Sequence, residues 1–168
     1  MSELLRVLTQ PLSHSVTQPL KMKQQILEYY KQLVQDRIDV FQDMISGLTD
    51  DAQNDAKGSA GDKHETALSM MHLEQEKLNH KLQEVLAQKA ILDKIDASVS
   101  PQKVALGSLV QSNGMWLFVC TALPKITLEG QTVFAISPQS PLGSRLMGNG
   151  VGFTAEINGK EYLIEALV

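Results

Sequence analysis

The residues best suited to chemistry in this sequence lie in the segment KGSAGDKHET, residues 57–66. Asp62 and Glu65 stand three residues apart, after two glycines and where a helical pattern begins. Two carboxylates at this spacing can share a hard cation such as Mg²⁺, but only weakly, because Mg²⁺ keeps several waters and needs other ligands or phosphates. We therefore expect no stably bound cofactor, and a metal site that a partner completes.

A purely structural explanation exists for the same two residues. Asp62 and Glu65 match the outline of a capping box, and negative charge in the first turn of a helix is favoured by the helix dipole. The charge is nevertheless concentrated: residues 50–65 hold five acids and two bases, a net −3, whereas the whole chain carries −4. Residues 103–168 are balanced, with four acids and four bases.

Two long helical patterns must position this acidic segment. Between Lys21 and Asp96 there is no proline, and glycine occurs only at 47, 58 and 61. Apolar or aromatic residues fill six of seven and six of eight positions in two series with 3-4 spacing, at 27, 30, 34, 37, 41, 44 and 48 and at 68, 71, 75, 78, 82, 85, 89 and 92. Such narrow seams are typical of a coiled coil, so we expect an antiparallel hairpin of about 55 Å. A four-helix bundle of two hairpins, or a module that serves only to dimerise, is the alternative.

The second half of the chain has the composition of a small β domain. Eight glycines follow Pro101, and Asn113-Gly114 and Asn158-Gly159 each separate two apolar runs, as in tight hairpins. QTVFAI predicts a further strand, and residues 140–149 predict a short helix that Ser140 caps. The expected fold class is α+β, with residues 1–20 as a lead, 21–97 as the hairpin and 98–168 as an antiparallel β domain with one short helix.

Several classes of function are disfavoured by composition. A net charge of −4 argues against a broad nucleic-acid-binding surface, and no apolar run reaches the length of a membrane span. The N-terminus lacks the features of a secretory signal, so we expect a cytoplasmic protein. Cys120 is the only cysteine and lies in the apolar run WLFVC, so neither a disulfide nor a nucleophilic enzyme is expected.

The combination of motifs resembles the Gre transcript-cleavage factors of bacteria. Their tip has the pattern Gly-Asp-x-x-Glu-Asn, with which Gly61, Asp62, Glu65 and Thr66 align. Their C-terminal domain is FKBP-like, and its start resembles VALGSLV here, while its Ser-Pro, small helix and glycine resemble SPLGSRLMGNGVG. The resemblance covers residues 21–168.

This resemblance implies a function. Gre factors bind RNA polymerase through the C-terminal domain, insert the coiled coil into the secondary channel and stimulate cleavage of backtracked RNA. The implied site is Asp62 and Glu65, which would share a Mg²⁺ ion with the polymerase. The implied partner-binding residues are those of the small-helix motif, namely Ser140, Pro141, Leu142, Gly143, Leu146 and Gly148. The protein would then be a monomeric accessory factor and not itself an enzyme, with indirect contact to nascent RNA, no membrane contact and no sequence-specific binding to DNA.

The sequence departs from the Gre pattern at three places. Ala67-Leu68-Ser69 stands where Gre factors usually have Ala-Glu-Tyr, Asn149 replaces a lysine, and no basic patch for RNA is evident on the hairpin. These departures leave open a second function, that of a non-cleaving regulator or inhibitor that occupies the secondary channel. An FKBP-like domain also raises the possibility of a prolyl isomerase, which fold alone does not support.

Overall fold

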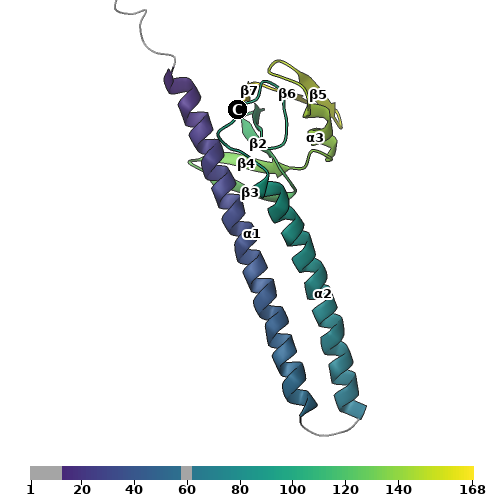
Figure 1. Ribbon diagram of the computed structural model, residues 1–168. Coiled ribbons are helices and arrows are strands. Elements are labelled where there is room, and N and C mark those ends of the chain that lie inside the picture. The colour runs from purple at the N-terminus through teal and green to yellow at the C-terminus, as the bar shows by residue number, and fades with distance from the viewer. Residues whose placement is uncertain (1–12, 58–61) are drawn as a thin grey trace, which may run out of the picture. The chain divides into compact units, whose positions relative to one another are not determined.

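The computed structural model describes the backbone of residues 13–57 and 62–168, with side chains omitted at 13–17, 56 and 62–64. Two helices are followed by seven short strands and one further short helix (Figure 1). The chain divides into two compact units. One comprises Tyr29–Lys94, and the other comprises Ile95–Val168 together with the described residues up to Glu28. The α+β class expected from the sequence is confirmed.

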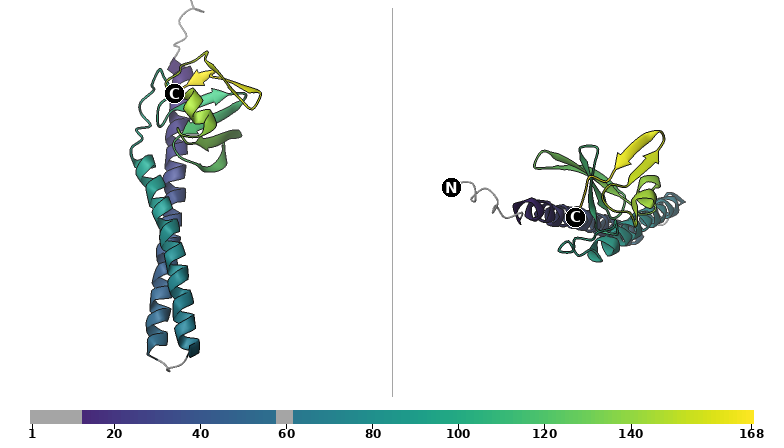
Figure 2. Two further views of the ribbon diagram at one scale, coloured as in Figure 1. Left: turned by 90° about the vertical axis from the view of Figure 1, so that its right-hand side faces the viewer. Right: turned by 90° about the horizontal axis from the view of Figure 1, so that it is seen from above.

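The unit Tyr29–Lys94 is an antiparallel helical hairpin. Its helices belong to α1 (Ser13–Ala56) and α2 (Asp62–Asp93), which run side by side in Figure 1 and in the left view of Figure 2. Near the end of the hairpin away from the turn, the Lys31 ammonium lies 3.8 Å from the Asp93 carboxylate. Nearer the turn, the Gln75 side chain donates a hydrogen bond to the Thr49 hydroxyl at 3.1 Å. At about 1.5 Å per residue, α2 is about 48 Å long.

The buried seam of α2 follows the predicted series, whereas that of α1 differs at two positions. Leu78, Val85 and Leu92 are buried on α2. On α1 two residues of the expected series, Arg37 and Met44, are not core residues. Met44 is 51% exposed, and Ile38, which is only 3% exposed, takes the seam position next to Arg37. An α-helix has 3.6 residues per turn, so successive seam residues can be either three or four apart. A spacing of four occurs where it places a better apolar side chain in the interface. Ile38 is that side chain here.

The other unit contains two sheets. Five strands are ordered β3-β4-β2-β1-β7, and two more, β5 and β6, form a separate hairpin. The bounds are β1 Leu109–Ser112, β2 Met115–Val119, β3 Leu123–Leu128, β4 Gln131–Ile136, β5 Thr154–Ile157, β6 Lys160–Leu163 and β7 Ala166–Leu167. Asn113 and Asn158 have φ of 52° and 53°, so both predicted Asn-Gly turns are present.

One strand pair was not expected from the sequence. All pairs in the two sheets are antiparallel except β2 and β4, which are parallel with Leu117 opposite Phe134. The β3–β4 hairpin lies on the far side of β2 from β1, with β4 inside and β3 at the edge. The antiparallel sheet predicted for this domain is therefore mostly antiparallel, with one parallel pair at its centre.

Side chains of β2 are buried on both faces of the sheet. Leu117 and Val119 point to one face and join Leu146 of the short helix α3 (Pro141–Leu146) in a core cluster. Trp116 and Phe118 point to the opposite face and are also buried. This second buried face distinguishes the central strand from an edge strand with one face in solvent.

The beginning of α1 belongs to the same unit as the sheet. Lys23 is 1% exposed, and its ammonium donates to the backbone oxygens of Val99 at 2.6 Å and Val168 at 3.1 Å. Helix α1 begins at Ser13, although a lead was expected up to residue 20, and Pro19 lies inside the helix. Residues 1–12 of that lead lie outside the described part of the chain. None of the described helices is long and apolar enough to cross a membrane.

Candidate functional site

The acidic segment lies at the turn of the helical hairpin. Helix α1 ends at Ala56 and α2 begins at Asp62, so the turn is at the opposite end of the hairpin from Tyr29 and Lys94. One hydrogen bond joins the two helices in the half of the hairpin nearer this turn, and a second lies within α1. The Gln75 amide donates to the Thr49 hydroxyl, which donates to the Ile45 carbonyl at 3.0 Å.

The two predicted metal ligands are only partly described. Asp62 is the first residue of α2, and its side chain lies outside the described set, as does all of Gly61. Glu65 is exposed in the first turn of α2. Among the side chains that the structure describes, which do not include those of residues 62–64, no group of three or more potential metal ligands occurs. A shared, weak site at Asp62 and Glu65 therefore stays a prediction.

Further carboxylates surround the same turn. Asp50, Asp51 and Asp55 are exposed in the last two turns of α1, and none makes an ion pair with another described residue. The last turn of α1 contains no basic residue, and the C-terminal end of a helix carries partial negative charge. An acid in this last turn, such as Asp55, is therefore unfavourable. Helix capping explains Glu65, but it does not explain Asp51 and Asp55, which concentrate negative potential at the end of the hairpin.

The predicted partner-binding motif forms a capped helix in the β unit. The Ser140 hydroxyl accepts from the Gly143 amide at 3.0 Å and donates to the Ser137 carbonyl at 2.6 Å, while Pro141 occupies the first turn. Leu146 is fully buried in the core cluster, and Gly143 is buried against Ser137. Gly148 follows the helix with φ of 78°.

This geometry separates two roles within the motif. Gly143 and Leu146 build the fold, because neither is accessible to a partner. Pro141 and Gly148 are exposed, and Ser140 and Leu142 are half-buried. If the motif contacts a partner, the contact is made by these four residues.

Cys120 is not available for chemistry. Its side chain is buried, and burial raises the pKa of the thiol to about 12. The reactive species of cysteine is the thiolate, which is negligible at neutral pH with such a pKa. The expectation of an inert buried cysteine agrees with this environment.

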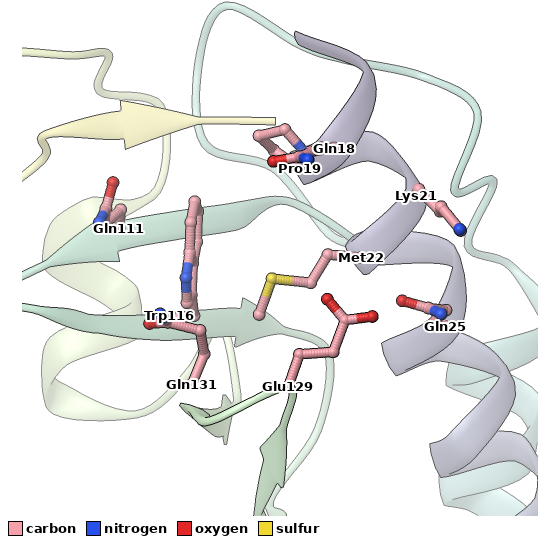
Figure 3. A pocket seen from close by; sticks show the side chains of 9 residues that line it. All are labelled: Gln18, Pro19, Lys21, Met22, Gln25, Gln111, Trp116, Glu129 and Gln131. Carbon is pink, nitrogen blue, oxygen red and sulfur yellow. The ribbon is translucent and has the colours of Figure 1, made fainter. Parts of the chain in front are cut away.

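A pocket that the sequence analysis did not predict lies beside the start of α1 (Figure 3). Its volume is about 560 Å³, within the range of ligand sites. Trp116 of β2 and Met22 of α1 form apolar walls, and Figure 3 shows the Met22 side chain between the indole and the Glu129 carboxylate. Apart from Pro19, the rest of the lining is polar and consists of Gln18, Lys21, Gln25, Gln111 and Gln131. All of these residues belong to one unit.

Glu129 stands at an unusual position of a tight turn. It joins β3 to β4 with φ of 50°, followed by Gly130 with φ of 77°. Asn113 and Asn158 hold the equivalent position in the other two tight turns of this unit. Asn is the favoured residue there because its side chain tolerates positive φ, whereas Glu does not share this preference. The one sequence feature that could have pointed to the pocket is therefore Glu129-Gly130 where Asn-Gly is expected.

Comparisons with known proteins find little at the level of sequence. No protein-family model and no curated protein matches this chain. Among solved structures, the chain is similar to GreA factor homolog 1 of Thermus thermophilus, with 16% identity and a TM-score of 0.31. The match covers 82% of this chain and 94% of that one. The α+β architecture described above rests on the helices and strands of this chain itself.

Proposed function

We propose that this protein is a Gre-like transcription factor. In this proposal it binds RNA polymerase, inserts the helical hairpin into the secondary channel and stimulates cleavage of backtracked RNA through Asp62 and Glu65. The Gre-like tip and C-terminal motifs of the sequence support it, as does the order of elements, a helical hairpin before a small β domain.

The observation that carries the proposal is the cluster of carboxylates at the turn of the hairpin. Asp51 and Asp55 remain exposed and make no ion pair with other described residues, and Asp55 lies in the last turn of α1, where the dipole disfavours an acid. Residues kept at a local cost are candidates for function. A cation-loaded catalytic centre in another protein is the kind of target that such a surface suits.

The residues of the turn fit a shared metal ion but not a resident one. Carboxylate oxygens are ligands for Mg²⁺, and the described residues offer no complete set for it. When bound in the polymerase, two metal ions stabilise the attacking and leaving oxygens of a phosphodiester. The part assigned to this chain is to bring Asp62 and Glu65 to that centre on a rigid hairpin about 48 Å long.

A non-cleaving regulator of the secondary channel is the second candidate. Leu68 is half-buried on the seam of α2, at the place where Gre factors usually carry a third acid. A hairpin with fewer tip acids can still occupy a channel by shape and charge. In that case the protein would inhibit or retune the polymerase without changing its RNA-cleaving activity.

The test is RNA release from a backtracked elongation complex assembled with the cognate polymerase. Native protein is compared with Asp62→Ala/Glu65→Ala and with a matched control, Glu76→Ala/Glu84→Ala. The control removes two exposed acids from α2 away from the turn. We expect stimulated cleavage with the native protein and the control, and a loss of at least about tenfold with the tip variant, in line with the removal of catalytic electrostatic groups.

Three outcomes separate the candidates. Loss of cleavage with retained binding of the tip variant supports the cleavage factor. No cleavage by the native protein, together with competition against a known channel-binding factor, supports the regulator. If the native protein neither stimulates cleavage nor competes, the proposed function is refuted. Because a dimerisation module would also give this last result, sedimentation over a range of protein concentrations then shows whether the hairpins self-associate.

A further inference from the structure

We propose that the pocket beside the start of α1 binds an arginine side chain presented by an exposed segment of a partner protein. The pocket is the one lined by Trp116, Met22 and Glu129 (Figure 3). This inference does not rest on the proposed function, because it concerns residues that the proposed function does not use.

The charge of the pocket favours a cationic group. The Glu129 carboxylate makes no ion pair or hydrogen bond with any other residue that the structure describes. Lys21 is the one basic residue in the lining, and Figure 3 shows its ammonium directed away from Glu129. A ligand cation can therefore pair with Glu129 without displacing an internal partner.

The apolar walls favour a guanidinium over an ammonium. Trp116 is 8% exposed and faces the pocket across from Met22. A guanidinium is planar and weakly hydrated, so it can lie against the apolar Met22 side chain, which stands between the indole and Glu129, while two of its N–H groups pair with the carboxylate; an ammonium is a compact and strongly hydrated charge.

The remaining lining favours a peptide over a free small cation. Gln18, Gln25, Gln111 and Gln131 supply four carboxamides around the rim. Each carboxamide can both donate and accept, which matches the N–H and C=O groups of a peptide backbone. An extended segment carrying one arginine uses both the charged end and the polar rim of a pocket of this size.

The turn that carries Glu129 gives a second line of support. Glu occupies a left-handed position at which the two comparable turns of the unit use Asn. Backbone strain at a ligand site is a known pattern, in which the residue is kept for the contact that it makes. The chain therefore keeps a less favourable turn residue, and that residue places its carboxylate in the pocket.

Intrinsic fluorescence provides a direct assay, because Trp116 is the only tryptophan of the chain. The probe is the blocked tripeptide acetyl-Gly-Arg-Gly-amide, titrated to about 20 mM against the full-length protein. The control probe replaces arginine with citrulline, which has nearly the same shape but no charge. We expect a saturable change for the arginine peptide, with a dissociation constant on the order of 1 mM, and a response at least about tenfold weaker for citrulline.

Two variants locate the contact. Glu129→Gln removes the charge and is expected to weaken binding about tenfold, whereas Glu165→Gln, an exposed acid of the same unit outside the pocket, should leave it unchanged. Glu129→Asn should weaken binding equally and also raise the midpoint of urea unfolding, because it restores the favoured turn residue. A gain in stability together with a loss of binding is a result that a merely structural Glu129 cannot give.

Several results would overturn the inference. These are an equal response to citrulline, unchanged binding by Glu129→Gln, and no saturable change up to the highest peptide concentration. Methylguanidinium serves as a further probe for the source of the cation. If it binds as tightly as the peptide, the carboxamide rim contributes nothing, and the assignment to a protein segment is wrong.

Discussion

The buried ammonium of Lys23 is the feature of this fold whose removal has the most definite consequence. Lys23 is 1% exposed and donates to the backbone oxygens of Val99 and Val168. Those two oxygens lie 76 and 145 residues further along the chain, so one side chain joins the start of α1 to two distant segments. Replacement by methionine leaves an unbranched side chain that is one atom shorter and removes both donated hydrogen bonds.

The size of the effect follows from two opposing contributions. An unpaired buried acceptor costs about 1–3 kcal/mol, and a lost hydrogen bond to a charged group is of similar size. The bond to Val168 is buried, whereas that to Val99 is partly buried, so water can replace the second more readily. Methionine in turn relieves the cost of holding a charge away from water. We expect Lys23→Met to lower the free energy of unfolding by about 1–2 kcal/mol at pH 7.

The stability that Lys23→Met loses relative to the native protein should be larger at alkaline pH. Burial lowers the pKa of Lys23 from its ordinary value of 10.5, and attraction to Asp96 opposes that decrease. At pH values between the lowered pKa of Lys23 in the folded protein and 10.5, the unfolded chain binds more protons than the folded one. The stability that Lys23 contributes therefore rises with pH in that window. The neutral amine still donates hydrogen bonds but no longer incurs the cost of a buried charge. The difference between native protein and Lys23→Met should therefore increase as pH approaches 10.5.

Urea unfolding followed by Trp116 fluorescence measures this difference, because Trp116 and Lys23 belong to the same unit. With a denaturant slope of about 1 kcal/mol per molar, the midpoint should fall by about 1–2 M at pH 7. Lys21→Met is the matched control, since Lys21 is exposed and its loss should shift the midpoint little. If Lys23→Met has the same urea midpoint as the native protein at pH 7, or if the difference between their midpoints shrinks as pH rises, this account is refuted.

Three further predictions concern backbone space and thiol access. Gly143→Ala should lower the melting temperature by several degrees, a loss of about 2 kcal/mol or more, because a Cβ atom at Gly143 would lie 2.0 Å from the Ser137 oxygen. Thermal unfolding followed by circular dichroism measures this, and an unchanged melting temperature would mean that the loop before α3 shifts freely. Gly47→Ala should raise the stability of the hairpin by about 0.5–1 kcal/mol, since alanine is the better helix former and, apart from the adjacent residues and backbone of its own helix, no atom lies within 4 Å of the added Cβ. Cys120 should resist a thiol reagent such as dithionitrobenzoate at pH 8 and react at once in denaturant, because its pKa is about 12 and its side chain is buried; rapid labelling of the folded protein would contradict this burial.

Local patterns were enough to predict the main elements. A series with 3-4 spacing identified the seam of α2, since the period of a helix depends only on its own geometry. Asn113-Gly114 and Asn158-Gly159 predicted their turns because positive φ is a property of single residues. Ser140 and Pro141 predicted the start of α3 for the same reason, as capping is local.

Features that depend on distant partners were not predictable in this way. The parallel pairing of β2 with β4 is a choice among strands, and nothing in either strand alone specifies it. Ile38 in place of Arg37 at the seam depends on how α2 faces α1. The sequence predicted the hairpin only from residue 21, yet α1 begins at Ser13 and includes Pro19.

The candidate sites show the same division. The sequence by itself indicated the acidic turn at Asp62 and Glu65, because charged residues, glycines and the signals of helix starts can be recognised from neighbouring residues alone. Only the tertiary structure buried Lys23 and assembled the pocket of Trp116, Met22 and Glu129, from segments about a hundred residues apart. Burial and cavities arise when such segments pack together, and no local pattern of residues encodes which segments will meet.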